Sequence, residues 1–198
     1  MVLLVVYLVE FSALAIHPYD RTDWIAENIP IVLIVAFLVA TYRRFQFSNL
    51  SYMLMSALVF LHTIGGHYTF ERVPFGLITS LIGAHRNHFD RVAHFTVGLY
   101  AFPVAEFIER RQLIRVRWVT CLFAVFAICT VAMGYEIFEW IYAVSASPSA
   151  GQAFLGSQGD PWDAQEDMLC DAVGAIAAVL LYLRVVRFRD LPHRQPRG

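Results

Sequence analysis

The sequence contains no lysine and few charged residues of any kind. All 15 basic residues are arginines, and charged residues make up only 16% of the 198 residues, whereas a soluble domain carries about a quarter. So few charges could not cover the surface of a soluble globule, and an apolar content of 58% excludes a disordered chain. Basic and acidic residues nearly cancel, at 15 against 16, so no basic surface is available for nucleic acid. The composition predicts a protein that crosses a membrane several times.

Cysteine is also scarce. Cys121, Cys129 and Cys170 are odd in number, lie in apolar runs and show no CxxC or CxxH spacing. These features exclude a disulfide framework and a zinc ribbon, and they indicate small core residues.

Six apolar runs are present, and we expect an all-α, polytopic transmembrane bundle of six spans that forms one domain over residues 1–198. A spanning helix needs about 17 to 25 residues, so the last four runs are long enough and the first two must borrow flanking residues. The first run also resembles a signal peptide that ends at Ala13-Leu14-Ala15, but no basic residue precedes it and Glu10 lies inside it. The runs cover residues 1–16, 29–42, 51–67, 89–107, 118–144 and 167–186.

The arginines predict the orientation, because cytoplasmic loops are rich in basic residues. If both termini are cytoplasmic, eleven arginines lie inside and four lie outside, and no basic residue falls between residues 145 and 165. The outer loop between the third and fourth runs contains apolar residues with helical spacing over residues 75–83, which predicts a short helix in the membrane interface. The four outer arginines are Arg21, Arg72, Arg86 and Arg91.

Ionisable residues inside membrane spans are costly, so each one needs a reason. In this topology five spans carry histidine or carboxylate side chains to the same outer leaflet. Pairs within one helix share a face, since they are three or four residues apart, and Asp163, Asp167 and Asp171 form a stripe that continues as the small residues Gly174 and Ala178. The residues at this depth are Glu10, His62, His67, Asp90, His94, Glu136, Glu139, Asp167 and Asp171, with Asp160 and Asp163 just above.

This convergence predicts a site for a divalent metal ion, Zn, Mg or Mn, or for a shared proton. We expect Glu136, Asp167, Asp171, His94 and His62 to be metal ligands. His94, Asp90, Glu136 and Asp167 are the catalytic candidates, with Asp90 orienting His94, and Arg86, Arg91 and His67 are the candidates for substrate binding. Structural roles stay open beside these: Asp160 before Pro161 has the pattern of an N-cap, and a lone histidine is often a core residue with one hydrogen bond.

The polar motifs resemble the YjdF-like inner-membrane family of bacteria over nearly the whole chain. The motifs include His17-Pro18-Tyr19-Asp20-Arg21, Gly65-Gly66-His67-Tyr68-Thr69, Arg86-Asn87-His88-Phe89-Asp90-Arg91 and Gln158-Gly159-Asp160. This resemblance implies a helical inner-membrane protein and no defined reaction. The second half is also similar to VanZ-like membrane proteins, through Asp90-Arg91 with His94-Phe95, Glu136, and Asp167 with Asp171 and Gly174-Ala175. That similarity implies an outward-facing site for cell-envelope lipids, although Asp171 stands where VanZ-like chains usually carry Asn.

Three functions are compatible with this sequence. The first is an envelope enzyme, a hydrolase or transferase, that acts on a membrane lipid or lipid-linked substrate by metal-assisted or acid–base chemistry. The second is a proton- or cation-coupled transporter, which would need polar residues along a path to the cytoplasmic face. The third is a non-catalytic scaffold whose acids pair with arginines and leave no cavity.

Overall fold

The computed structural model describes residues 2–81, 83, 86–145 and 157–190, and all of its regular structure is helical, which confirms the all-α expectation. The elements are α1 (Val2–Leu14), α2 (Arg21–Thr41), α3 (Asn49–Tyr68), α4 (Gly76–Leu81), α5 (Phe89–Gly98), α6 (Ala101–Arg110), α7 (Arg117–Ser145), the 3₁₀ turn η1 (Ser157–Gly159) and α9 (Asp163–Asp190).

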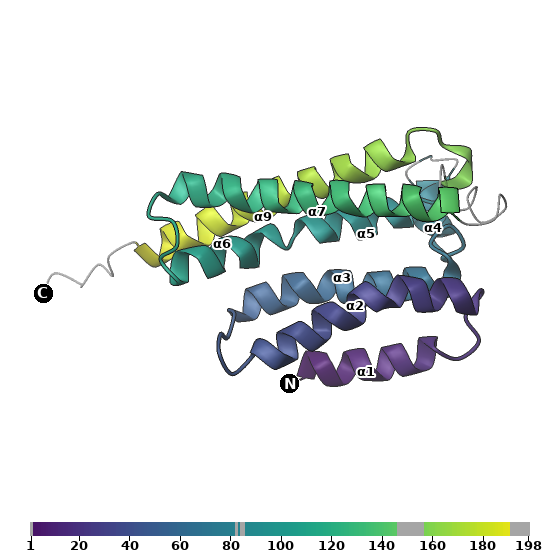
Figure 1. Ribbon diagram of the computed structural model, residues 1–198, viewed down its shortest axis with the longest axis horizontal. Helices are drawn as coiled ribbons and strands as arrows, with labels where there is room; N and C mark the ends of the chain where they lie inside the picture. The colour runs from purple at the N-terminus through teal and green to yellow at the C-terminus, as the bar shows by residue number, and fades with distance from the viewer. Residues whose placement is uncertain (1, 82, 84–85, 146–156, 191–198) are drawn as a thin grey trace, which may run out of the picture.

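The helices form two groups that meet along α3 and α5. In the first group α1 and α2 pack on α3, and in the second α5, α6 and α7 pack on α9. Successive long segments run in opposite directions, and α6 continues the direction of α5 (Figure 1). The start of α1 and the end of α9 point toward one end of the bundle, and α4 lies at the opposite end (Figure 1). We call this opposite end the α4 end.

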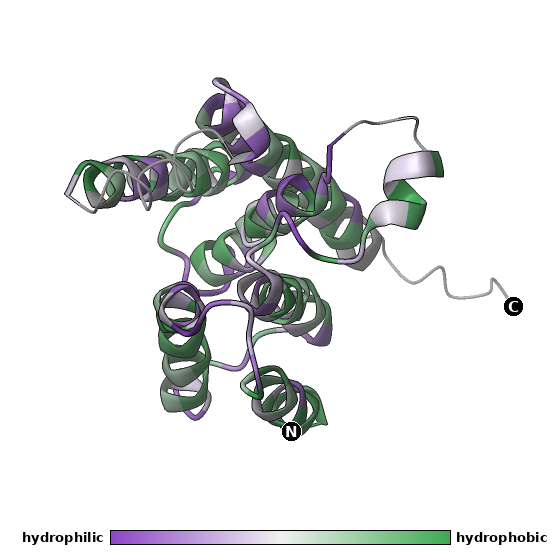
Figure 2. Ribbon diagram, turned by 90° about the vertical axis from the view of Figure 1, so that its right-hand side faces the viewer, coloured by the Kyte–Doolittle hydropathy of each residue, from purple (hydrophilic) through white to green (hydrophobic). Residues whose placement is uncertain are grey.

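Three helices are long and apolar enough to cross a membrane, judged by length and composition. They are α2, α7 and the part of α9 from Asp163 to Val186. Much of the helical ribbon has the colour of hydrophobic residues (Figure 2), and large side chains such as Leu33 on α2 and Phe126 on α7 are more than half exposed. Outward-facing apolar side chains of this size suit contact with lipid.

The second helix begins earlier than the run at residues 29–42 predicts. The side chain of Asp20 accepts hydrogen bonds from the backbone N–H groups of Thr22 and Asp23, at 2.7 and 3.0 Å, and this N-cap starts the helix at Arg21. The helix therefore has 21 residues, and Glu27 lies inside it.

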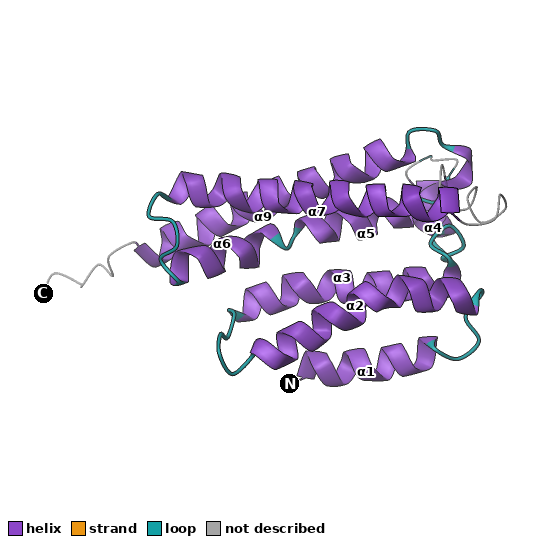
Figure 3. Cartoon of the chain, in the orientation of Figure 1, coloured by secondary structure: helices purple, strands orange, loops and turns teal. Residues whose placement is uncertain are grey.

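The prediction of one continuous helix over residues 89–107 is wrong. The helix stops after Gly98 and restarts at Ala101 (Figure 3). Pro103 explains the break, because proline has no N–H to donate to the carbonyl of Leu99 and its ring collides with that carbonyl in a regular helix. The turn is held by tighter bonds three residues apart, from the N–H of Tyr100 to Val97 and from that of Phe102 to Leu99.

The short helix expected over residues 75–83 is present as α4. Its side chains Leu77 and Leu81 are three-quarters exposed. An exposed apolar helix of this length at the end of the bundle is suited to the membrane interface.

Two glycines bring α5 and α9 into backbone contact. A Cβ atom at Gly98 would lie 2.4 Å from the carbonyl oxygen of Asp171, and one at Gly174 would lie 2.1 Å from the carbonyl oxygen of Phe95. Neither distance can accommodate a side chain. The small-residue stripe predicted on α9 is therefore the surface that receives α5.

At the end opposite α4, buried Glu106 joins α6 to the start of α3. Its carboxylate accepts hydrogen bonds from the N–H and hydroxyl of Ser48, from the hydroxyl of Ser51 and from Arg110. The Glu106 carboxylate therefore has a structural role, because its hydrogen bonds link α6 to the start of α3.

We predict that Gly174→Ala lowers the free energy of unfolding by about 1–3 kcal/mol, because the added methyl forces α5 and α9 apart. Thermal unfolding of the detergent-solubilised protein measures the effect. Gly134→Ala is the matched control: a Cβ there meets no atom within 4 Å, so the higher helix propensity of alanine should keep or raise the stability. An unchanged melting temperature for Gly174→Ala would contradict the close packing.

Candidate functional site

The close contact of α5 with α9 also aligns their polar residues toward the α4 end. Three aspartates follow Gly174 along α9 toward the α4 end, at one, two and three helical turns: Asp171, Asp167 and Asp163. Three residues of α5 face them: Asp90, Arg91 and His94. All three aspartates of this stripe are buried, and so is the α5 residue Arg91. The stripe of aspartates predicted from the spacing therefore lies between α9 and α5.

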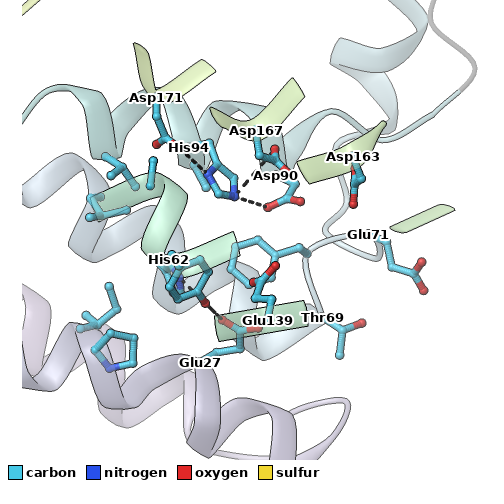
Figure 4. Close-up of a pocket in the computed structure, with 18 of the residues that line it drawn as sticks. Glu27, His62, Thr69, Glu71, Asp90, His94, Glu139, Asp163, Asp167 and Asp171 are labelled. Carbon is cyan, nitrogen blue, oxygen red and sulfur yellow. Dashed lines mark hydrogen bonds and ion pairs between the residues drawn. The ribbon is translucent and has the colours of Figure 1, made fainter. Parts of the chain in front are cut away.

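His94 lies at the centre of the aspartates (Figure 4). Its Nδ1 atom is 3.1 Å from an oxygen of Asp171, and its Nε2 atom is 3.7 Å from Asp167 and 3.8 Å from Asp90. Because a carboxylate only accepts hydrogen bonds, Nδ1 carries the proton that it donates to Asp171. In the neutral ring the lone pair of Nε2 then points between Asp90 and Asp167.

Asp171 is fully buried, and one of its oxygens, Oδ1, has no hydrogen-bond partner among the described residues. A buried carboxylate oxygen without a donor is costly. This oxygen belongs to a residue that lines the pocket described below, so a donor or cation bound there would complete it.

Two arginines neutralise the outer part of the stripe. Arg91 donates to Asp167, to Asp163 at 2.7 Å and to Glu166 at 3.0 Å. Arg86 donates to Asp160 at 2.5 Å and to Asp163 at 2.8 Å. Both guanidinium groups, which the sequence suggested for substrate binding, thus have carboxylate partners within the protein.

Asp160 combines the two roles considered for it. Its side chain accepts the backbone N–H of Trp162 at 2.9 Å, just before α9, and it also binds Arg86. The Trp162 N–H, together with the neighbouring arginines, lowers the pKa of the Asp160 carboxyl. Asp160 therefore remains ionised, and it fixes the backbone just before α9.

A second group of polar side chains faces His94 from α2, α3 and α7. Glu27 lies 3.7 Å from Nε2 of His62 and accepts a hydrogen bond of 3.4 Å from the hydroxyl of Tyr135 (Figure 4). Neither Glu27 nor Tyr135 is among the site residues that the sequence predicts. The N-cap pattern at Asp20 could have found Glu27, because it places this residue in the second turn of a helix, whereas no pattern distinguished Tyr135 from the interface aromatics.

Both groups line one pocket with a volume of about 380 Å³, which is in the range of ligand sites. The polar part of the wall is strongly acidic, with Arg72 as its only arginine among the described residues. The deeper part is apolar. The acidic lining residues are Asp23, Glu27, Glu71, Asp90, Glu139, Asp163, Asp167 and Asp171, and the apolar ones include Pro30, Ile31, Ile34, Leu58, Val97, Val131 and Ala132.

Three of the residues expected at the outer leaflet do not line this pocket. Nδ1 of His67 lies 2.7 Å from the carbonyl oxygen of Leu14, so His67 holds the end of α1. Glu136 is not a lining residue, and its helical neighbour Glu139 lines the pocket in its place. Glu10 of α1 is also absent from the wall, and α2 contributes Glu27 instead.

Asp90, His94 and Asp167 have the geometry of a metal site. Each offers one ligand atom, and these atoms all lie within 4.8 Å of one another. Ligand atoms around a tetrahedral ion with bonds of about 2.1 Å lie about 3.4 Å apart, and the two separations from His94, 3.7 and 3.8 Å, are slightly longer than this. Asp171 then takes the position of the carboxylate that orients a metal-binding imidazole.

The comparisons with known proteins agree with the fold. The model of a family described as "Predicted membrane protein (DUF2238)" matches residues 1–188. The chain is 36% identical over 179 residues to the inner membrane protein YjdF of Escherichia coli (strain K12), which covers 85% of this chain and 81% of that protein. No solved structure matches. The YjdF-like resemblance and the inner-membrane location are confirmed, and the VanZ-like similarity rests on the quoted residues alone.

We predict that Arg91→Met lowers the free energy of unfolding by about 3–5 kcal/mol, because it leaves buried carboxylates without their cation. Thermal unfolding in detergent measures the change. Arg72→Met is the control: that side chain is half exposed and contacts Glu71 at 3.4 Å, so its loss should cost at most about 1 kcal/mol. Adding Asp167→Asn to Arg91→Met should restore part of the loss, and a double variant less stable than the single one would contradict this interpretation.

Proposed function

The chain belongs to the DUF2238 family of predicted membrane proteins, and we propose that it is a membrane-embedded, metal-dependent hydrolase or transferase. The observation that carries the proposal is the arrangement of His94. Its Nδ1 is fixed by buried Asp171, and its Nε2 faces Asp90 and Asp167 across distances that a divalent cation can bridge. Zn²⁺, Mg²⁺ or Mn²⁺ is the cation proposed.

The cation would activate a water molecule or polarise the substrate, and the chain's own residues would hold the groups in place. Asp171 would orient His94, and Arg91 would fix Asp167. His62 and Glu139, on other parts of the pocket wall, are available to carry protons. Glu136, which is not a lining residue, would act on the site only through its charge.

The acidity of the pocket constrains the substrate. Carboxylates on this wall repel a phosphate headgroup, so an anionic substrate needs the cation as its contact. An envelope lipid or lipid-linked precursor would combine such a headgroup with an apolar part that suits the deeper wall. This substrate class is the one we propose.

The deep wall also favours an enzyme over a transporter. A transporter needs polar residues along a path to the opposite face, but the lining residues furthest from the α4 end on α2, α3 and α5 are the apolar Ile34, Leu58 and Val97. A scaffold would use up its acids in ion pairs, as Asp160 does with Arg86. The pocket remains, however, and one oxygen of Asp171 has no partner among the described residues.

We further propose six membrane passes with both termini cytoplasmic. The alternating direction of α1, α2, α3, the α5–α6 pair, α7 and α9 supports this count (Figure 1). Eleven of the fifteen arginines belong to the segments at the end opposite α4 in this topology. The pocket would then face outward.

If the proposal is correct, purified protein equilibrated with Zn²⁺ or Mn²⁺ and then desalted retains the ion, and elemental analysis measures it. His94→Ala should reduce the bound ion to background, and Asp171→Asn should weaken binding by about 10–100-fold, because it acts through His94. A chelator should lower the melting temperature of the loaded protein. Glu166→Gln is the control, since it removes a carboxylate one residue from Asp167 without removing a ligand. A folded wild-type protein that retains no ion would overturn the metal assignment.

The topology can be tested by labelling single cysteines at Ser149 and Arg194, which lie outside the described residues, after the three native cysteines are replaced. A membrane-impermeant maleimide added to intact cells should label position 149 and should reach position 194 only after the membrane is opened. Labelling of position 149 from the cytoplasmic side alone would reverse the orientation.

A further inference from the structure

Two of the helices that form the deeper wall of the pocket, α2 and α7, belong to different halves of the bundle. Pro30, Ile31 and Ile34 of α2 lie on one side, and Val131 and Ala132 of α7 lie on the other. The main packing partner of α2 is α3, whereas α7 packs on α9 and α6. The two helices thus share a pocket wall while each packs on a different neighbour.

The polar contact between α2 and α7 is one turn nearer the α4 end. There the hydroxyl of Tyr135 donates to Glu27 across 3.4 Å, which is long for an O–H···O bond. Glu27 lies four residues before Ile31, and Tyr135 lies four residues after Val131. These spacings are one helical turn, so Ile31 and Val131 lie one turn further from the α4 end than the polar contact. We call the apolar space between α2 and α7 at Ile31 and Val131 the window.

Val131 shows that this window reaches the outer surface. It lines the pocket and yet is 62% exposed. The helix faces beside the window carry exposed Ile29 and Leu33 on α2 and Met133 on α7, which suit contact with lipid tails. In a bilayer the pocket would therefore open sideways into hydrocarbon.

We propose that the alkyl chain of a membrane lipid enters the pocket through this window, between α2 and α7 and below the Tyr135–Glu27 contact. The chain lies against Ile31, Ile34 and Ala132, and the headgroup reaches His94 and the aspartates. An apolar wall gives a chain no hydrophobic gain over the bilayer, because lipid tails are equally apolar, but it also imposes no penalty. The affinity then comes from the headgroup, and the window selects amphiphiles that are already in the membrane.

This inference rests on the proposed function only for the reaction of the headgroup. Entry of the chain needs no cation, so it can be tested with a chelator present. A failure of one proposal is then distinguishable from a failure of the other.

The test uses the full-length protein in vesicles of phosphatidylethanolamine and phosphatidylglycerol that contain a phosphatidylethanolamine with a photoreactive diazirine in its acyl chain. After illumination, peptide mass spectrometry locates the labelled residues. We expect labels on Ile31 and Ala132, which are almost fully buried and which lipid outside the bundle cannot touch. Val59 and Ile128 are equally buried and do not line the pocket, so they should stay unlabelled.

Val131→Trp should reduce the labels on Ile31 and Ala132 to background, because the indole fills the window. The exposed position of Val131 can accept the indole without repacking the core. Met133→Trp, on the same helix and outside the pocket, should leave the labels unchanged, and both variants should keep the label on lipid-facing Phe126. Labels confined to residues such as Leu33 and Phe126, or equal labelling of Val59 and Ile128, would overturn the proposal.

Discussion

The backbone contact between α5 and α9 is the constraint on which the rest of the site depends. Gly98 and Gly174 leave no room for a Cβ atom, so the two helices approach more closely than side chains would permit. One to three turns away, the same approach sets His94 against Asp171 and Arg91 against Asp167 and Asp163. Wider helix spacing would separate these groups and admit lipid or water between them.

Electrostatics then divides the stripe of aspartates into two parts. At the outer end Arg86 and Arg91 bind Asp160, Asp163 and Asp167, which compensates the cost of burying these charges. His94 lies between Asp90, Asp167 and Asp171, at 3.1 to 3.8 Å from a carboxylate oxygen of each. Asp167 therefore joins the arginine pairs to the His94 group, in which one oxygen of Asp171 has no hydrogen-bond partner among the described residues. This difference separates a scaffold from a site on the same helix face.

The pocket joins that deeper part to a second wall from the first half of the bundle. Glu27 and His62 face the His94 group across the cavity (Figure 4), and the apolar residues below them lead to the window at Val131. The pocket thus has a polar part and an apolar part, as an amphiphile has. This arrangement is the basis for the proposed enzyme that takes its substrate from the membrane.

The sequence by itself determined the class of the protein and the helix face on which several of its polar groups lie. Too few charges for a soluble surface required a membrane, helical spacing put Asp163, Asp167 and Asp171 on one face, and glycine and alanine marked the side of close packing. These properties are local, since they depend on composition and on the period of the helix. Prediction failed where a local signal competed with another: Pro103 interrupted an apolar run, and the Asp20 cap extended a helix beyond its apolar residues.

Only the tertiary structure decided which of the residues expected at the outer leaflet meet. Helical period fixes the face of a residue within its own helix, but the rotation and partner of that helix follow from packing over the whole bundle. Hence Glu139 lines the pocket and Glu136 does not, His67 holds Leu14, and Glu27 comes from a helix that the sequence argument had given no part in the site. The sequence predicted that the acids lie at one depth. The contact of α5 with α9 determined which of them His94 touches, because Gly98 and Gly174 allow the two backbones to meet there.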